Sequence, residues 1–131
     1  MIAATEIAYL DTDVVVWLAQ GSLESLSPRA VALLETAALL VSPTVLLELE
    51  YLREAGRIRL PARDIQRKVE HELGVRLCDL PFSAIVSAAL DESWTRDPFD
   101  RLVVANAKAN GFASLISADN EIARHYPRTV W

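Results

Sequence analysis

Residues 97–120, DPFDRLVVANAKANGFASLISADN, contain a complete helix–turn–strand unit. Asp97 followed by Pro98 predicts a helix start, because aspartate caps the first backbone N–H groups and proline suits the first turn. Asn110-Gly111 predicts the end of that helix, and residues 114–117 form a short strand centred on Leu115 and Ile116. A strand without a polar face, directly after a helix, is typical of a parallel sheet covered on both sides.

The same alternation extends from this unit toward both ends of the chain. Further strands are predicted over residues 7–10, 39–41 and 75–78, with an edge strand over 129–131. Helices are predicted over residues 12–19, 28–38, 43–55, 61–73, 81–94, 98–110 and 120–125. Short buried strands separated by helices predict an α/β fold with a central parallel sheet. We expect residues 1–131 to form a single domain.

The composition is that of a compact globular protein. Hydrophobic residues make up 52% of the 131 positions, yet no apolar run is long enough to span a bilayer. The first ten residues contain Glu6 and no basic start, so no signal peptide is expected and a cytoplasmic location is predicted. The single cysteine, Cys78, excludes an intramolecular disulfide and is expected to be buried in the core.

The charge is unevenly distributed. The net charge of −5 argues against a passive nucleic-acid binder. Residues 53–68, however, contain six cations and two anions, which leaves −9 on the rest of the chain. An acidic body with one basic segment suits an enzyme that holds metal ions and contacts a polyanion. Arg53, Arg57 and Arg59 are therefore candidate RNA-binding residues, with a solvated helix face as the alternative.

Acidic residues follow the predicted strands. Asp11 comes directly after the first strand and Asp119 after residues 114–118, while Asp97 and Asp100 open the helix between them. Each could merely cap a helix or complement its dipole. Capping alone would not bring these acids together. The carboxyl ends of parallel strands share one edge of the sheet, so the fold itself is expected to gather them there.

Glu48 is the most informative acid. Within the helix predicted over residues 43–55, a rotation of about 100° per residue places Glu48 on the apolar side. A buried carboxylate needs compensation, either from an arginine or from a metal ion shared with other carboxylates. Carboxylates without a histidine or cysteine cluster favour Mg²⁺ or Mn²⁺ over zinc. Two such ions about 4 Å apart could clamp a phosphodiester, one activating water and the other stabilising the leaving oxygen.

Several segments together resemble a known family. Leu10-Asp11-Thr12, Ser42-Pro43-Thr44 with Glu48, DPFDRLVVANA at residues 97–107 and ISAD at 116–119 resemble the PIN-domain ribonucleases, and more narrowly the VapC-type toxins of prokaryotic toxin–antitoxin pairs. The resemblance covers essentially the whole chain. It implies a three-layer α/β/α sandwich, RNA cleavage with magnesium or manganese, a homodimer, and inhibition by a small antitoxin protein that wraps over the site.

The resemblance also assigns residues. It implies that the catalytic and metal-binding set is Asp11, Glu48, Asp100 and Asp119. Asp97 belongs to the DPFDR subtype, where it is a helix cap or a supporting group. Thr12 could hydrogen-bond a metal ligand or phosphate, or simply begin its helix. Arg101 could brace the carboxylates, touch phosphate, or face solvent.

Two alternative functions remain open. Asp11-Thr12-Asp13 after an apolar strand imitates the opening motif of haloacid-dehalogenase-like phosphatases, in which Asp11 would be the nucleophile. The chain could also be a non-catalytic PIN-like protein that binds RNA or a partner. Among the remaining candidates, the two histidines are expected at the surface and the three tryptophans are expected to pack rather than stack on bases. These are His71, His125, Trp17, Trp94 and Trp131.

Overall fold

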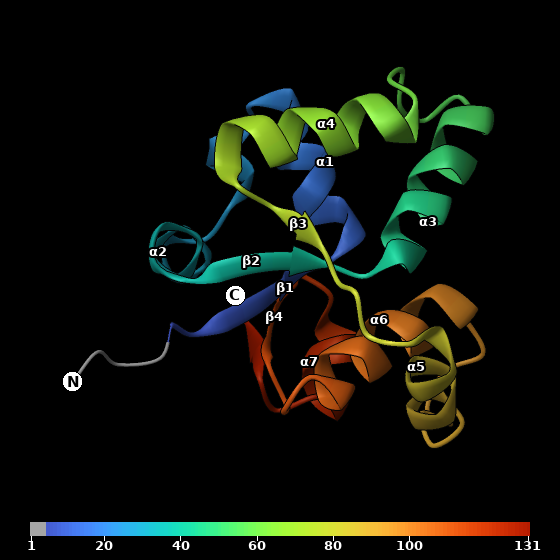
Figure 1. Cartoon of the computed structure of the whole chain (residues 1–131). Helices are drawn as coiled ribbons and strands as arrows, with labels where there is room; N and C mark the ends of the chain where they lie inside the picture. The colour runs from blue at the N-terminus through green and yellow to red at the C-terminus, as the bar shows by residue number, and fades with distance from the viewer. Residues whose placement is uncertain (1–4) are drawn as a thin grey trace.

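The computed structural model describes residues 5–131, which form one parallel sheet with helices on both faces (Figure 1). The five strands lie in the order β3-β2-β1-β4-β5. Their bounds are β1 (Ile7–Leu10), β2 (Ala38–Val41), β3 (Arg76–Leu77), β4 (Ser114–Ile116) and β5 (Thr129–Val130). The helices are α1 (Thr12–Gln20), α2 (Pro28–Thr36), α3 (Pro43–Glu54), α4 (Ala62–Leu73), α5 (Phe82–Ala89), α6 (Pro98–Ala109) and α7 (Asn120–His125), with a 3₁₀ turn at Leu23–Ser25.

The helices form two layers around the sheet. Figure 1 shows α1 and α4 on one side of the strands and α5, α6 and α7 on the other. The chain runs outward from β1 through β2 to β3 and then returns to β4, on the opposite side of β1. The predicted three-layer α/β/α sandwich is therefore confirmed. Its strand order reverses at β1, which is where sites form in open parallel sheets.

Local sequence signals account for most of the element boundaries. The Ser27 hydroxyl accepts a hydrogen bond from Ala30 N at 3.1 Å and so caps α2. Gly21 and Gly74 end α1 and α4 with φ of 71° and 69°, the left-handed conformation in which glycine carries no steric cost. The predicted cap positions are thus confirmed, although several elements are shorter than expected.

One predicted helix, over residues 81–94, is wrong in its second half. Helix α5 ends at Ala89, and residues 90–97 form turns that lead into α6. No glycine or proline marks this end in the sequence. The reason is a tertiary contact, because Glu92 turns inward, is only 2% exposed and forms an ion pair with Lys108 of α6. The short segment that follows joins α5 to the acidic start of α6.

The central strands form a fully buried platform for the site. Leu10, Leu115 and Ile116 have no exposed surface, and burying each such side chain contributes about 1.5–3 kcal/mol. Cys78 is buried as predicted, and its sulfur accepts a hydrogen bond from the Tyr9 hydroxyl at 3.0 Å. Burial of that hydroxyl raises the pKa of Tyr9. The core is therefore closed directly behind the carboxyl ends of β1 and β4.

The aromatic predictions are confirmed in their main point. All three tryptophans are half-buried and pack against the core, and the rings of Trp17 and Trp131 lie 5.7 Å apart. His71 and His125 are exposed. Within residues 5–131, no helix has the length and apolar character that a membrane crossing needs.

Candidate functional site

Asp11 lies where β1 ends and α1 begins. Strands β1 and β4 are in register with Leu10 beside Ile116, so the next residues, Asp11 and Ser117, are neighbours. The Ser117 hydroxyl donates to Asp11 Oδ2 at 2.6 Å, and Thr12 N donates to Asp11 Oδ1 at 2.8 Å. Burial raises the pKa of Asp11, and these two hydrogen bonds oppose that rise. Asp11 is thus a fixed, partly buried carboxylate.

Glu48 enters the same site from α3. Ser42 caps that helix by accepting a hydrogen bond from Thr44 N at 3.2 Å, and Glu48 lies in the second turn of α3. The Thr12 hydroxyl, only 3% exposed, donates to Glu48 Oε1. Burial raises the pKa of Glu48, and the nearby charge of Asp11 raises it further. Glu48 forms no salt bridge within residues 5–131, so the arginine partner considered from the sequence is not present there.

The start of α6 supplies two more carboxylates. Asp97 caps the helix, with its Oδ1 accepting from Phe99 N at 2.8 Å and Asp100 N at 3.3 Å. Asp100, half-buried in the first turn, has its pKa raised to about 7. Burial is the main cause, followed by the charges of Asp97, Asp11, Asp119 and Glu48. The charge of every other acid in the predicted set therefore acts on the carboxyl group of Asp100.

Asp119 follows β4 and caps α7. Its Oδ1 accepts from Glu121 N at 2.8 Å and Ile122 N at 3.2 Å, while its own N–H donates to the Ser117 hydroxyl at 3.1 Å. Ser117, 1% exposed, thus connects the backbone of Asp119 to the side chain of Asp11. Sequence reasoning assigned this serine no role. The signal that could have found it is a small hydroxyl residue at a strand end, two positions before an acid.

Arg101 has a different contact from the one expected of a carboxylate brace. Its Nε donates to the carbonyl oxygen of Thr95 at 2.7 Å, and it forms no salt bridge within the described chain. The side chain therefore fixes the segment that leads into α6. Of the three supporting residues, Thr12 contacts the carboxylate of Glu48, Asp97 caps the helix that carries Asp100, and Arg101 contacts the backbone before that helix.

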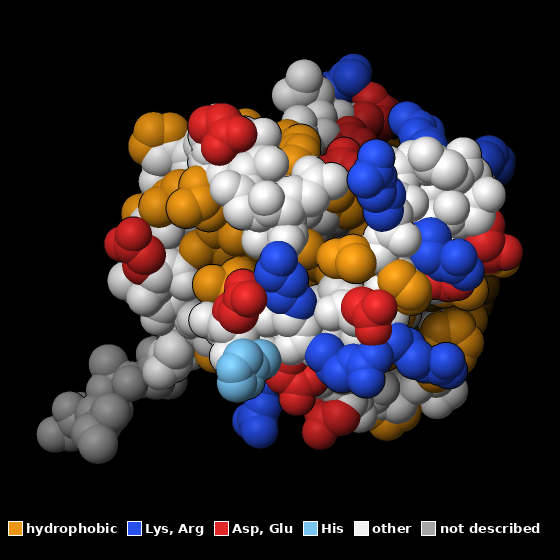
Figure 2. Space-filling view, turned by 90° about the horizontal axis from the view of Figure 1, so that it is seen from above, with side chains coloured by type: hydrophobic (Ala, Val, Ile, Leu, Met, Phe, Trp, Pro, Cys, Tyr) orange, Lys and Arg blue, Asp and Glu red, His pale blue; other side chains and the backbone are white. Residues whose placement is uncertain are grey.

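The basic segment 53–68 covers the end of α3, the connection to α4 and the first half of α4. Arg53 pairs with Glu50, and Arg67 pairs with Asp64 at 2.6 Å. Arg57 and Arg59 are exposed between α3 and α4. Figure 2, which looks onto the face covered by α4, shows cationic side chains interspersed with acidic ones rather than a continuous basic patch.

The acidic site suits a hard divalent cation in its donor chemistry. It offers carboxylate oxygens from four separate chain segments, and within residues 5–131 none of these acids forms a salt bridge. Burial, followed by the charges of neighbouring acids, raises the pKa values of Asp11, Glu48 and Asp100, and a divalent cation would favour their ionised forms. No three of the described carboxylates are yet arranged to enclose an ion.

Comparison with solved structures supports the fold. A chain in the crystal structure of VapBC2 from Rickettsia felis, bound to a DNA fragment from its promoter, superposes with a TM-score of 0.57 and 18% identity over 94% of this chain and 95% of that one. A chain of a toxin–antitoxin complex from Klebsiella pneumoniae gives 0.58 and 16% over 95% and 96%. At these identities the likeness concerns the fold. A search of curated proteins found no significant match.

Comparison with family models is more specific. The model of the PIN domain matches residues 8–126. The matched range contains the acids from Asp11 to Asp119 and the strands β1 to β4 that position them. The chain therefore belongs to the PIN domain family.

Proposed function

We propose that this PIN-domain chain is a metal-dependent ribonuclease that hydrolyses RNA phosphodiester bonds, and that it is the toxin of a toxin–antitoxin pair. The observation that carries the nuclease proposal is the gathering of four carboxylates at the point where the strand order reverses, none of which forms a salt bridge with any residue between 5 and 131. A protein that only bound RNA would gain nothing from like charges placed opposite a phosphate backbone.

Asp11, Glu48, Asp100 and Asp119 are the residues that would hold Mg²⁺ or Mn²⁺. A divalent ion at such a site lowers the pKa of a bound water and offsets the charge on the leaving oxygen. The chain's own contribution is orientation, because the hydroxyls of Thr12 and Ser117 hold the carboxylates of Glu48 and Asp11. The helix N-termini capped by Asp11, Asp97 and Asp119 add positive dipole ends, which favour both the acids and a phosphate group.

The toxin proposal rests on the proteins that share this fold and on an exposed apolar groove in this chain. The similar chain from Klebsiella pneumoniae comes from a toxin–antitoxin complex, and the one from Rickettsia felis comes from VapBC2 bound to a DNA fragment of its promoter. In this chain, Leu47, Tyr51 and Phe82 expose 51%, 52% and 62% of their surface around an apolar groove between α3 and α6. Exposed apolar side chains grouped in this way are typical of protein interfaces. We propose a cognate antitoxin as a partner, a homodimer as the assembly and the cytoplasm as the location.

The decisive experiment measures cleavage of total RNA by the purified chain with added Mn²⁺. We expect cleavage that EDTA abolishes and that Asp11→Asn eliminates. Asp13→Asn is the matched control, because Asp13 is the exposed acid two positions along and should be dispensable. The same pair of variants tests the phosphatase alternative, which requires Asp13. RNA binding without cleavage in the presence of Mn²⁺ would instead favour the non-catalytic alternative.

The toxin proposal has a separate test. Expression of the wild-type chain alone should arrest growth, and Asp100→Ala should relieve the arrest. A harmless wild-type chain at high expression would contradict the toxin role, while Mn²⁺-dependent cleavage in vitro would still support the nuclease.

A further inference from the structure

The segment between α5 and α6 is attached to the molecule through a buried carboxylate. Glu92 is 2% exposed and forms an ion pair with Lys108 of α6. Its Oε2 also accepts a hydrogen bond from Trp94 Nε1 at 2.6 Å. A buried charge held by two partners has little freedom to move. Trp94 is therefore held at its indole nitrogen.

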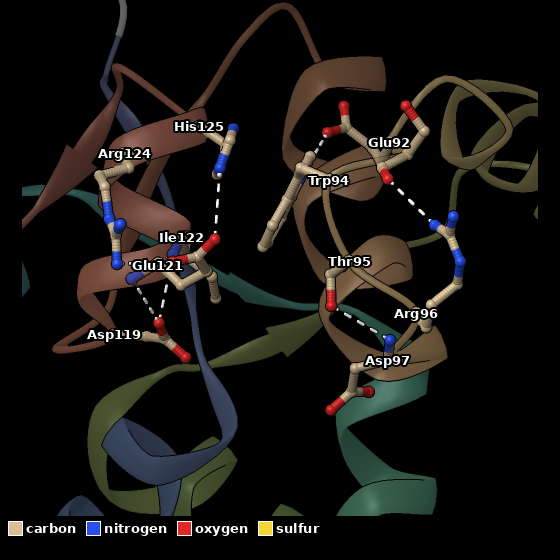
Figure 3. A network of polar contacts seen from close by, with 11 residues as sticks. Glu92, Trp94, Thr95, Arg96, Asp97, Asp119, Glu121, Ile122, Arg124 and His125 are labelled. Carbon is tan, nitrogen blue, oxygen red and sulfur yellow. Dashed lines mark hydrogen bonds and ion pairs between the residues drawn. The ribbon is translucent and has the colours of Figure 1, made fainter.

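The Trp94 ring stacks on a side chain from the other acidic segment. The rings of Trp94 and His125 lie 4.8 Å apart at an angle of 10°. On its far side, His125 Nε2 lies 3.4 Å from Glu121 Oε1, within α7. Figure 3 shows Trp94 projecting from the segment before α6 toward His125 of α7. These two side chains form the Trp94–His125 stack.

The stack joins the two chain segments that carry acids on opposite sides of the site. Trp94 lies three residues before Asp97, the cap of α6, and His125 lies on the short helix that Asp119 caps. In Figure 3, Asp97 and Asp119 lie on the two sides of the gap that the stack bridges. Both segments carry carboxylates, Asp97 on one and Asp119 on the other, so their like charges repel each other across the site.

We infer that the Trp94–His125 stack is a positioning contact that ties the segment leading into α6, which carries Asp97 and Asp100, to the helix that Asp119 caps, and that it thereby favours binding of a divalent cation by these acids. The contact opposes the carboxylate repulsion through the stacking of two rings. It acts through Asp97, Asp100 and Asp119, so Trp94 and His125 are positioning residues rather than catalytic ones. This inference rests on the proposed metal-dependent nuclease.

The test compares Mn²⁺ affinity, measured by calorimetry on the full chain, between neighbouring variants of α7. His125→Ala should weaken Mn²⁺ binding by about three- to tenfold, which is the range expected for removal of an aromatic pair. His125→Phe keeps a ring for stacking and should stay within about twofold of the wild type. Arg124→Ala is the matched control, because Arg124 pairs with the same Glu121 at 2.6 Å but touches no aromatic ring.

A second pair of variants approaches the contact from the other side. Trp94→Leu removes the ring and should weaken Mn²⁺ binding as His125→Ala does, whereas Trp94→Phe should retain most of the affinity. Combining His125→Ala with Trp94→Leu should cost no more than either change alone, since both remove the same contact. Thermal unfolding without metal verifies that each variant is folded at the temperature of the titration.

The outcomes separate the inference from the proposed function. A wild-type chain that binds no Mn²⁺ overturns both. A wild-type chain that binds and cleaves, while His125→Ala behaves like Arg124→Ala or His125→Phe loses as much as His125→Ala, overturns the positioning role alone. Additive losses in the double variant would likewise contradict a shared contact.

Discussion

The Ser117 hydroxyl lies between two acids and binds both, donating to Asp11 Oδ2 at 2.6 Å and accepting from Asp119 N at 3.1 Å. This arrangement follows from the parallel register of β1 and β4, which sets Ser117 beside Asp11. A single buried hydroxyl therefore fixes one carboxylate and the backbone that carries another. Such hydrogen bonds around metal-binding carboxylates set ligand orientation.

Ser117→Ala should weaken Mn²⁺ binding by about 10- to 100-fold, because Asp11 loses a partner and Asp119 N–H is left unpaired. The unpaired N–H should also cost about 1–3 kcal/mol of unfolding free energy. Calorimetry and urea denaturation measure the two effects. Ser114→Ala is the control, since Ser114 lies at the other end of β4 and contacts Glu6 instead. Equal losses of Mn²⁺ affinity in both variants would contradict the role of Ser117.

The stability of the metal-free protein should fall as the pH rises from about 4 to about 7. Asp100 has a pKa near 3.8 in the unfolded chain and about 7 in the folded one, mainly because of burial. The folded state therefore binds more protons than the unfolded state across this interval, and raising the pH favours unfolding. Asp100→Asn should remove much of that dependence. Melting temperatures in EDTA at pH 5 and pH 7.5 measure it.

The metal should reverse this trend. A divalent cation competes with the proton on Asp100, so Mn²⁺ affinity should rise with pH through about 7 and Mn²⁺ should stabilise the fold most above it. A metal-free melting temperature that is unchanged or rising between pH 5 and pH 7.5 would contradict this prediction.

The fold was predictable where local signals and topology agree. Caps such as Ser27 and Asp97, together with apolar strands between helices, define the sandwich without long-range information. The convergence of Asp11, Asp100 and Asp119 also follows, because strand ends in a parallel sheet share one edge. Each of these inferences needs only a short stretch of sequence and one rule of topology.

Tertiary contacts explain what the sequence did not reveal. The helix predicted over residues 81–94 ends early because Glu92 pairs with Lys108, and nothing near Glu92 indicates this. The contact of Trp94 with His125 joins residues without a common periodicity. Both arise from the packing of side chains distant in sequence, which single-sequence patterns do not encode.

The buried pair of Glu92 and Lys108 should be essential as a pair. Lys108→Met leaves the carboxylate of Glu92, which is 2% exposed, without its counter-ion. We expect a loss of about 3–5 kcal/mol in unfolding free energy. Adding Glu92→Gln to Lys108→Met should recover a large part, because the amide is neutral and its oxygen still accepts from Trp94. Urea denaturation of both variants measures the recovery, and a double variant no more stable than Lys108→Met would contradict it.

The exposed arginines between α3 and α4 should contribute to RNA affinity without affecting the metal site. Arg57 and Arg59 are exposed and have no salt-bridge partner within residues 5–131, in contrast to Arg53 and Arg67. Replacing both with glutamate should weaken RNA binding. It should also reduce the magnitude of the negative slope of log affinity against log salt, by about 0.7 for each phosphate that is no longer neutralised.

Arg29→Glu on α2 is the control for a general change of net charge, because Arg29 is exposed on a different helix. Binding titrations of a catalytically inactive Asp11→Asn background at several salt concentrations separate these cases. An unchanged slope with unchanged affinity would show that the basic segment is only a solvated surface. An equal effect of Arg29→Glu would show that Arg57 and Arg59 influence RNA affinity only through long-range electrostatics.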